Sequence, residues 1–511
     1  MTPIESADAL FLAGDLDAAA GAYRRLVAAD HRNQAAWRGL GAARLRARAF
    51  GEASDALDRA VHLQPNDGEA WMLRAEALFK LGDVEPAIGA YRRAAEDVTL
   101  RAAAEENIAI MIPGSALAGN AGVLAARRIF GRRLHAGVGP VERPPRPPSA
   151  GKLRIGYVSA FFDSANWMKP VYGVINRHDR ERFEVHLVSL GGDPSEQAGY
   201  RDHDLDVIWQ VGSLDDGRIA ALLAAAGIDV LVDLNSYSAP RWLPLFLRRP
   251  APVQIGWFNS FATYGFDCFD GIVGDDVVIP MAEEAYFAER VLRVRGTYLA
   301  FEVLYAVPDV APPPCCRNDG TLTFGALTSS YKLNDTTLGV WARVLRSAPG
   351  ARMLIRASTL SEPSNRDHLL ARFAALGIAR ERLDIEGGAT HFEFLRSYDR
   401  IDIALDMFPY SGGTTTSEAL WQGVPVLTCA GDRWVARTSE SLLRAAGLDA
   451  WVAADQEDLV AKASALARDP ATHATLAVLR ADMRARLAAS AACDTAGLCR
   501  ALEQIYRQAV G

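Results

Sequence analysis

The sequence predicts an α-helical repeat segment followed by two α/β domains. Roughly the first hundred residues repeat with a period of 34, and two later segments each carry five short apolar runs separated by helical patterns. Two proline clusters divide these parts. A chain of 511 residues is also too long for one hydrophobic core, and its length predicts about two to four domains.

The repeat is visible as rows of matching residues that lie 34 positions apart. This period and residue set are typical of tetratricopeptide repeats, in which each unit is a helix hairpin that buries its small-residue face against the next. We expect three units over residues 4–103, enough to stack, and assign residues 1–103 to them. The rows are Ala9, Ala43 and Ala77; Ala19, Ala53 and Ala87; Tyr23, Leu57 and Tyr91; and Trp37 and Trp71.

Stacked repeats form a concave surface, and we expect this one to hold a peptide or protein partner. The alternative is a helical cap that only stabilises the rest of the chain. Residues 104–150 are predicted to be a helical connector and a linker. The linker runs from Pro140 to Pro148, where proline is too dense to continue a helix and favours extended chain.

After the linker the pattern changes to short apolar runs of the kind that form buried parallel strands. Five runs precede the second proline cluster, Pro308 to Pro314, and five follow it. We therefore predict two Rossmann-like domains, residues 151–312 and 313–511, with a helix after about residue 490 that returns to the core. The predicted strands are 153–160, 183–190, 229–235, 252–258, 269–275, 322–328, 351–357, 382–387, 401–406 and 424–430.

The most informative segment is a Gly/Thr turn after strand 401–406, which leads into a helix at about residues 416–422. Such a turn aims backbone N–H groups and hydroxyls at one point above a positive helix N-terminus, where phosphate binds well. Glu418, in the first helical turn, is suited to accept hydrogen bonds from ribose hydroxyls. Together they predict a nucleotide-diphosphate site; the alternative is an ordinary helix N-cap. The turn residues are Ser411, Gly412, Gly413, Thr414 and Thr415.

This stretch resembles the donor-binding segment of the bacterial and eukaryotic O-linked N-acetylglucosamine transferases. That family's pattern is roughly D-x-x-P-Y-N-G-x-T-T-x-x-[DE]-A-L-W-x-G-V-P-V, and this chain reads DMFPYSGGTTTSEALWQGVPV. Thr414, Thr415 and Glu418 fall on the positions that contact the nucleotide in that family. The resemblance implies an architecture of the glycosyltransferase-B type, with an acceptor-side domain at 151–312 and a nucleotide-sugar-binding domain at 313–511.

The resemblance also implies an activity. It points to a metal-independent hexosyltransferase that moves N-acetylglucosamine from UDP-N-acetylglucosamine to serine or threonine of a protein held by the repeats. The nucleotide sugar is then a cosubstrate, and no cofactor or metal is expected. A D-x-D spacing at residues 202–206 is interpreted as a solvated acidic loop, because it does not follow an apolar strand.

Lys332 is the predicted catalytic residue. It follows strand 322–328, and a lysine at a strand's carboxyl end can neutralise a departing diphosphate. The resemblance implies that a lysine here contacts the donor phosphates, with Ser329 and Tyr331 in the same donor-binding segment. The alternative is a solvated surface lysine.

Three histidines of the resembling family are absent from the sugar and acceptor side of this chain. Asp163, Tyr237 and His391 are weak candidates for sugar or acceptor contacts there. Three interpretations remain open. The chain transfers N-acetylglucosamine without an essential protein base; or it uses another nucleotide sugar, such as a CMP-nonulosonic acid in flagellin modification; or it is a catalytically inactive tetratricopeptide scaffold.

Composition narrows the partners and the compartment. The net charge of −7 argues weakly against nucleic acid as the main partner. No apolar run reaches the roughly 18 residues of a membrane span, and the N-terminus lacks the pattern of a secretory signal. The six cysteines show no C-x-x-C spacing, so we expect reduced thiols in a cytoplasmic protein.

Overall fold

The computed structural model describes residues 1–139, 144, 151–201, 203–317 and 320–511. The linker predicted from Pro140 to Pro148 lies outside the described residues, apart from Pro144. The chain forms two compact units. The first consists of Met1–Leu117, Pro313–Tyr410 and Gln456–Thr475, and the second of Ala118–Pro312, Ser411–Asp455 and Leu476–Gly511. The predicted domain 313–511 is therefore divided between the two units.

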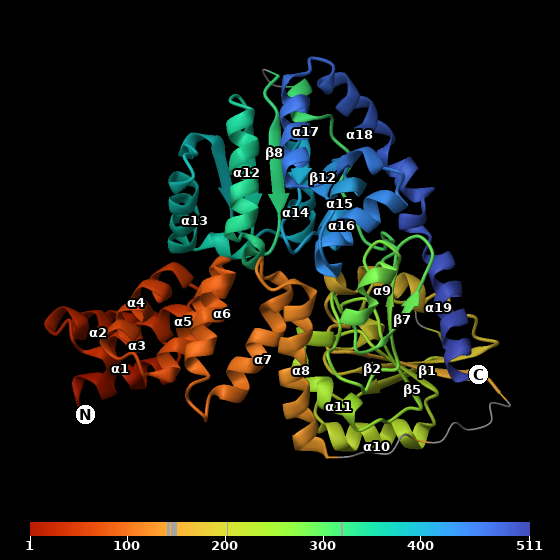
Figure 1. Cartoon of the computed structure of the whole chain (residues 1–511), viewed down its shortest axis with the longest axis horizontal. Coiled ribbons are helices and arrows are strands. Elements are labelled where there is room, and N and C mark those ends of the chain that lie inside the picture. The colour runs from red at the N-terminus through yellow and green to blue at the C-terminus, as the bar shows by residue number, and fades with distance from the viewer. Residues whose placement is uncertain (140–143, 145–150, 202, 318–319) are drawn as a thin grey trace. The chain divides into compact units, whose positions relative to one another are not determined.

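The N-terminal part of the first unit is a stack of helix hairpins (Figure 1), which confirms the predicted repeats. Polar N-caps begin the helices: Asn33 and Asp67, one period apart, each accept a 3.0 Å hydrogen bond from the backbone N–H three residues later. The hairpins are α1 (Pro3–Leu12) with α2 (Leu16–Ala29), α3 (Gln34–Arg46) with α4 (Phe50–Leu63), and α5 (Gly68–Leu81) with α6 (Val84–Ala94).

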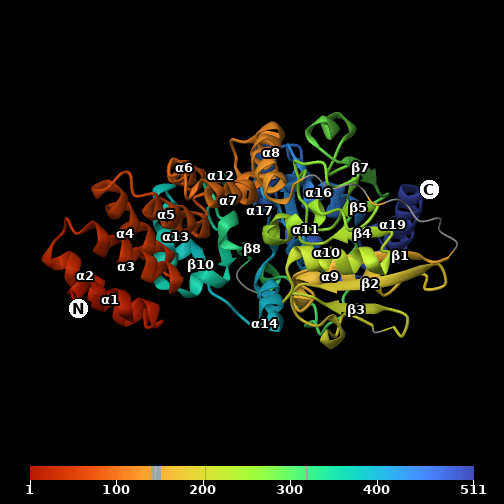
Figure 2. The ribbon, with the colours of Figure 1, turned by 90° about the horizontal axis from the view of Figure 1, so that it is seen from below.

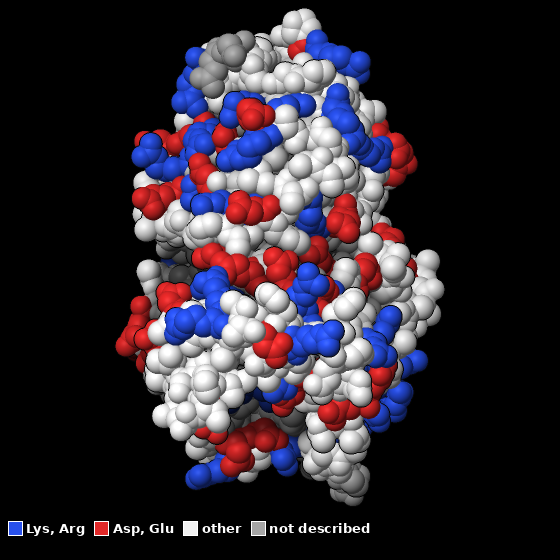
Figure 3. Space-filling model, turned by 90° about the vertical axis from the view of Figure 1, so that its left-hand side faces the viewer, with Lys and Arg blue, Asp and Glu red and all other residues white. Residues whose placement is uncertain are grey.

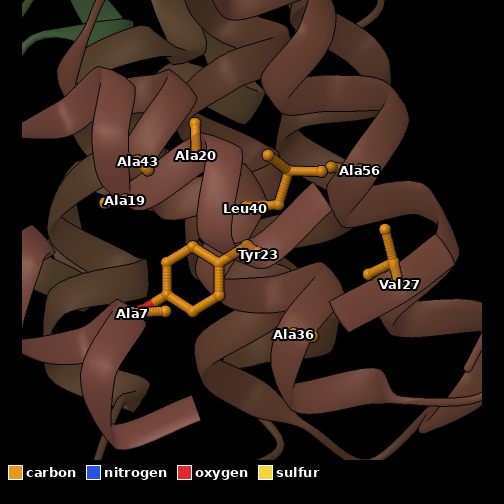
Figure 4. Packing of buried hydrophobic residues seen from close by; sticks show 9 residues of the cluster. All are labelled: Ala7, Ala19, Ala20, Tyr23, Val27, Ala36, Leu40, Ala43 and Ala56. Carbon is orange, nitrogen blue, oxygen red and sulfur yellow. The ribbon is translucent and has the colours of Figure 1, made fainter. Parts of the chain in front are cut away.

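The repeat core is built from small residues because the helices approach closely. Figure 4 shows Tyr23 and Leu40 among alanines that are almost fully buried. At Gly41 an added Cβ would lie 2.4 Å from Cγ of Leu57, and at Gly39 the same distance from the Tyr23 ring. A larger side chain at either glycine would separate neighbouring helices, which explains why the sequence keeps small residues in register.

The predicted connector is also helical, but its two helices belong to different units. Helix α7 (Arg101–Met111) and the short helix η1 (Ile112–Gly114) continue the first unit, whereas α8 (Gly119–Val138) belongs to the second. The boundary between the units therefore follows η1.

The rest of the first unit is α/β. Its parallel strands lie in the order β10-β9-β8-β11. The repeats pack against α13, where the Asn365 side chain accepts a 3.1 Å hydrogen bond from Gly51 N and donates a 2.9 Å one to Arg48 O. The elements are β8 (Thr323–Leu327), β9 (Arg352–Arg356), β10 (Leu383–Glu386), β11 (Ile403–Leu405), α12 (Asp335–Ser347), α13 (Pro363–Ala375), α14 (His391–Arg396) and α17 (Gln456–Arg468).

The second unit contains a seven-stranded parallel sheet in the order β3-β2-β1-β4-β5-β6-β7. Helix α9 (Ala165–Ile175) covers one face, and α10 (Asp216–Ala226) and α11 (Leu243–Leu247) cover the other (Figures 1 and 2). The strand order reverses between β1 and β4, as in a doubly wound fold. The strands are β1 (Leu153–Ser159), β2 (Phe183–Ser189), β3 (Val207–Gln210), β4 (Val230–Asp233), β5 (Val253–Gly256), β6 (Gly271–Gly274) and β7 (Arg290–Arg293).

The second unit also receives C-terminal segments. The predicted returning helix, α19 (Thr495–Val510), packs against α9, and the Glu503 carboxylate lies 2.9 Å from Nδ1 of His178. The other elements here are the parallel pair β12 (Val426–Cys429) and β13 (Val452–Ala453), and helices α15 (Thr414–Trp421) and α16 (Trp434–Ala445). Helix α18 (Thr472–Ala488) crosses from the first unit into the second.

All ten predicted strands are present, each within three residues of its predicted ends, whereas β3, β7 and β13 were not predicted. The acidic 202–206 segment is not wholly solvated, which corrects the expectation. The Asp206 side chain is fully buried and receives hydrogen bonds of 2.7 and 2.6 Å from the Arg180 guanidinium. Asp202 lies outside the described residues.

Two surface properties bear on the sequence expectations. Lys and Arg side chains are interspersed with Asp and Glu on the face drawn in Figure 3, so this face carries both signs of charge. Within the described part of the chain, none of the helices has the length and apolar character needed to cross a membrane.

Leu57→Ala is expected to lower the free energy of unfolding by about 2–5 kcal/mol, because Leu57 is fully buried between repeats and its loss leaves a cavity. Leu12→Ala is the matched control: Leu12 is 80% exposed, and the change should stay within about 0.5 kcal/mol. Urea denaturation of the whole chain, followed by helical circular dichroism, measures both. Equal effects of the two substitutions would contradict the packing described here.

Candidate functional site

Lys332 ends the short helix η7 (Ser330–Lys332), directly after β8. It is only 9% exposed, and its Nζ lies 4.3 Å from the centroid of the Tyr410 ring. Burial lowers the pKa of Lys332 to about 8, although the Asp406 carboxylate acts in the opposite direction. Lys332 is thus a desolvated cation on an aromatic face and not a solvated surface lysine, and its role at the donor phosphates stays a prediction.

The other predicted residues of this segment differ in exposure. Ser329 is exposed, and Tyr331 is half-buried, its ring in a T-shaped contact with the Tyr410 ring at a centroid distance of 5.7 Å. Tyr410 directly precedes Ser411, the first residue of the Gly/Thr turn. The first unit includes residues up to Tyr410, and the second unit includes those from Ser411 onwards, so the Lys332 segment and the turn belong to different compact units.

In the second unit, the first residues of the Gly/Thr turn attach it to α16. The Ser411 hydroxyl donates a 2.8 Å hydrogen bond to Val435 O, and the Ser439 hydroxyl donates a 3.1 Å bond to Gly412 O. A Cβ at Gly412 would lie 2.2 Å from Oγ1 of Thr416, so a side chain there is excluded. Ser411 and Gly412 therefore support the turn.

The exposed part of the turn is Gly413, Thr414 and Thr415. Helix α15 starts at Thr414, two residues earlier than predicted, so both threonines belong to its first turn. Gly413 is the N-cap residue and has no side chain to cap the helix. The first N–H groups of α15 thus form a partly positive end at half-exposed residues, which is the geometry of an anion site.

Glu418 is buried, and its predicted contact with ribose hydroxyls stays a prediction. It is 3% exposed and forms an ion pair with Lys169 of α9, which is 4% exposed. Nζ of Lys169 also lies 4.2 Å from the centroid of the Tyr305 ring. Burial raises the pKa of Glu418 and lowers that of Lys169, and their mutual attraction opposes both shifts.

Sequence reasoning did not identify Lys169. The signal available was a single charged residue in the mostly apolar helix sequence ANWMKPVYGVI. A lone lysine on an apolar helix predicts a buried carboxylate partner, but only the tertiary structure identifies that partner as Glu418.

The three weak candidates occupy unlike environments. Asp163 is exposed, and His391 is half-exposed at the first position of α14, its ring stacked 6.2 Å from Phe394. Tyr237 is 4% exposed, and its hydroxyl donates a 2.7 Å hydrogen bond to Tyr264 O. The Arg127 guanidinium lies 3.8 Å from its ring centroid. These contacts give Tyr237 a packing role, and a contact of its side chain with sugar or acceptor stays a prediction.

The carboxyl ends of β1 and β4 hold a buried acid that the sequence analysis did not single out. Asp233 accepts hydrogen bonds of 2.9 Å from the backbone of Asn235, the backbone of Ser236 and the Tyr264 hydroxyl. Burial raises its pKa to about 6. The Asn235 side chain accepts a 2.7 Å bond from Ala160 N, so this network shapes the loops at the switch point of the sheet.

One group among the described residues has the composition of a metal site: His178, Cys499 and Glu503, all buried. Nδ1 of His178 lies 2.9 Å from Glu503 and 3.5 Å from Sγ of Cys499, and Nε2 lies 2.7 Å from the Tyr157 hydroxyl. Both ring nitrogens thus have hydrogen-bonding partners. These hydrogen bonds join α19 to the sheet.

Comparison with known families identifies the chain. The family described as glycosyl transferase family 41 matches residues 140–307 and 317–502, and a tetratricopeptide repeat family matches residues 4–67 and 43–106. The chain belongs to glycosyl transferase family 41. This membership confirms the resemblance and the transferase class, and the repeat match confirms the predicted N-terminal segment.

One solved structure is similar to nearly the whole chain. The structure of a mutant of the Thermobaculum terrenum O-GlcNAc transferase is similar with a TM-score of 0.79 and 30% identity, covering 99% of this chain and 96% of that one. The match confirms the glycosyltransferase-B type of fold.

Two plant proteins named as probable N-acetylglucosaminyltransferases are also similar to this chain. A probable UDP-N-acetylglucosamine–peptide N-acetylglucosaminyltransferase SPINDLY from Petunia hybrida is 28% identical over 70% of this chain. The corresponding protein SEC from Arabidopsis thaliana is 26% identical over 58% of it. The chain spans only 38% and 31% of the lengths of these two proteins.

Lys169→Ala is expected to destabilise this family 41 chain by about 3–5 kcal/mol, because it leaves Glu418 buried without its cation. The double variant Lys169→Met/Glu418→Gln removes both charges and should recover much of that loss. Arg343→Ala is the control, since its partner Glu457 is 78% exposed, and it should cost about 1 kcal/mol or less. Urea unfolding measures all three, and a Lys169→Ala protein as stable as the control would refute the buried pair.

Proposed function

We propose that this chain is a protein O-glycosyltransferase that moves N-acetylglucosamine from UDP-N-acetylglucosamine to serine or threonine hydroxyls. The similarity over 99% of the chain to a structure named as an O-GlcNAc transferase carries the proposal. The names of the plant relatives, which specify UDP-N-acetylglucosamine and a peptide acceptor, support the same donor and acceptor class.

In the proposed reaction the acceptor hydroxyl oxygen forms a bond to the anomeric carbon of the sugar. The bond from that carbon to the diphosphate oxygen breaks, UDP leaves with the electron pair, and the hydroxyl proton ends in solvent. Negative charge builds on the diphosphate as it departs, so groups that stabilise that charge in the transition state accelerate the step.

Two segments are proposed to stabilise the donor, each on its own geometry. In the first unit, the Lys332 ammonium supplies a positive charge in a desolvated position, where its effect on a phosphate is greater than in water. In the second unit, the N-terminus of α15 supplies N–H groups and the hydroxyls of Thr414 and Thr415. Protein cations and N–H groups suffice for this role, so the proposal includes no metal and no cofactor.

Glu418 is proposed to act at the donor only together with Lys169, because the pair is buried as a unit. In this proposal the Lys169 ammonium orients the charged Glu418 carboxylate, which then accepts a hydrogen bond from a ribose hydroxyl. Ser329, Gly413 and Tyr331 remain proposed donor-side residues.

The repeats are proposed to hold the protein acceptor, as stacked tetratricopeptide repeats present an extended binding surface. Asp163 and His391 remain proposed contacts on the sugar or acceptor side. A cytoplasmic location is part of the proposal and is supported by six free cysteines, four of them buried.

The absence of three family histidines from this chain leaves two alternative functions: a CMP-sugar transferase acting on flagellin, and an inactive scaffold. The names of the relatives favour neither, since they specify a UDP sugar and a transferase. Binding of UDP and CMP to the purified chain distinguishes both alternatives from the proposed function.

UDP should bind the purified chain more tightly than CMP, and Lys332→Ala should weaken UDP binding at least tenfold because the diphosphate loses its cation. Titration calorimetry measures the binding, and transfer of labelled sugar to a peptide library measures the activity. Arg343→Ala, a change at an exposed ion pair, is the control. Preference for CMP would redirect the proposal to another sugar donor, and absence of binding to either nucleotide would leave the scaffold.

UDP affinity should also fall as the pH rises through about 8. The lysine binds the diphosphate in its protonated form, and burial lowers the pKa of Lys332 to about 8, so protonation is lost above that pH. Between pH 7 and 9 the affinity should fall about tenfold, whereas a solvated lysine would stay charged to about pH 10. Lys332→Arg, if it binds UDP, should lack this dependence because a guanidinium stays protonated. A flat wild-type profile would contradict the buried cation.

A further inference from the structure

The third repeat touches the segment that carries Lys332, and both lie in the first unit. The Phe79 ring of α5 stacks on the Tyr331 ring, with centroids 5.4 Å apart and planes 22° from parallel. Tyr331 is the middle residue of η7 and directly precedes Lys332. A ring of the repeat segment therefore covers the turn from which the lysine projects.

The end of α5 also packs against the backbone of that turn. Gly82 caps α5 in the left-handed region, with φ +94°. A Cβ there would lie 2.6 Å from Leu333 O and 2.9 Å from Ser330 O, distances that real side chains do not adopt. The close approach of two backbones is thus possible only because this residue is glycine.

A third contact ties the same two pieces together from α13. The Arg372 guanidinium donates a 2.7 Å hydrogen bond to Leu333 O and a 3.3 Å bond to Leu81 O. It also forms ion pairs with Asp83 at 3.4 Å and with Asp335 at 2.7 Å. One side chain therefore joins the end of α5 to the residue that follows Lys332.

The first repeat offers an internal comparison, because Phe11 and Gly14 occupy the positions of Phe79 and Gly82 two periods earlier. Gly14 has nearly the same backbone conformation, with φ +83°, but an added Cβ would meet nothing within 4 Å. Phe11 lies beneath the Arg46 guanidinium of its own neighbouring repeat. The same repeat position thus faces open space in the first repeat, at Gly14, and the Lys332 turn in the third repeat, at Gly82.

We propose that the third repeat is a positioning element for the donor site, in which Phe79 and Gly82 hold the turn that carries Lys332. This inference rests on the proposed function, since it gives the repeats a role in donor binding beyond holding the acceptor. The contact also keeps water from the base of the Lys332 side chain, in keeping with the 9% exposure of that residue.

The central experiment compares Gly82→Ala with Gly14→Ala. Both place alanine in a left-handed position, and Arg48, which has φ +63° at the same position of the second repeat, shows that the fold accepts a side chain there. Only Gly82→Ala pushes on the Lys332 turn. We expect Gly14→Ala to bind UDP as the wild type does and Gly82→Ala to bind at least tenfold more weakly. Equal UDP affinities for the two folded variants would overturn the inference.

A second pair of variants keeps the test informative if Gly82→Ala does not fold. Phe79→Ala admits water to the turn, so the midpoint of the pH dependence of UDP binding should shift upward from about 8 towards the usual lysine value. Phe11→Ala should leave that midpoint in place. Phe79→Tyr should also have the wild-type midpoint, because tyrosine keeps an aromatic ring at this position. An unchanged midpoint in Phe79→Ala would count against the inference, because a merely structural contact would lower stability without moving a titration.

A third readout separates this inference from the proposed function. Lys332 can be labelled with an amine-reactive reagent and quantified by mass spectrometry without any nucleotide. Faster labelling of Lys332 in Gly82→Ala than in Gly14→Ala supports the positioning role even if the wild type does not bind UDP. Equal labelling rates overturn the positioning role, whatever the donor proves to be.

Discussion

A buried ammonium group must find charges or aromatic faces that replace the water it has lost, and this constraint shapes the surroundings of one lysine in each compact unit. Lys332 lies on the Tyr410 ring with the Asp406 carboxylate acting on its charge. Lys169 lies on the Tyr305 ring and pairs with Glu418. Each lysine thus has an aromatic face and a carboxylate, and the loops and helix ends around it are arranged to supply them.

The surrounding structure serves mainly to keep short, irregular segments in place. The Gly/Thr turn is attached to α16 by hydroxyl–carbonyl hydrogen bonds from Ser411 and Ser439, which leaves the N-terminus of α15 half-exposed. The Lys332 turn is covered by Phe79 and joined to its neighbours through Arg372. In both places regular elements restrict a turn that would otherwise be mobile, and restriction of binding groups is what makes electrostatic stabilisation effective.

The elements that the sequence predicts correctly are those whose signal is local and periodic. The 34-residue period and the short apolar runs predicted the repeats and ten strands, because burial of a helix face or a strand imposes a pattern on the chain itself. Strands β3 and β7 were missed; their residues are mostly half-buried, so they do not form continuous apolar runs. The burial of Tyr237 and Glu418 could not be predicted, because it depends on contacts with residues distant in sequence, Tyr264 and Lys169.

By itself, the sequence determined the order of parts, the helical repeats, the parallel α/β character and the two segments that carry Lys332 and the Gly/Thr turn. Only the tertiary structure decided which charges are buried, which carboxylate meets Lys169, and which repeat touches the Lys332 turn. The physical reason is that backbone patterns reflect each residue's own preference for water or core. A pKa, an ion pair or a backbone contact depends on which other group the fold places next to a residue. When that group is far away in the sequence, no local sequence pattern records the contact.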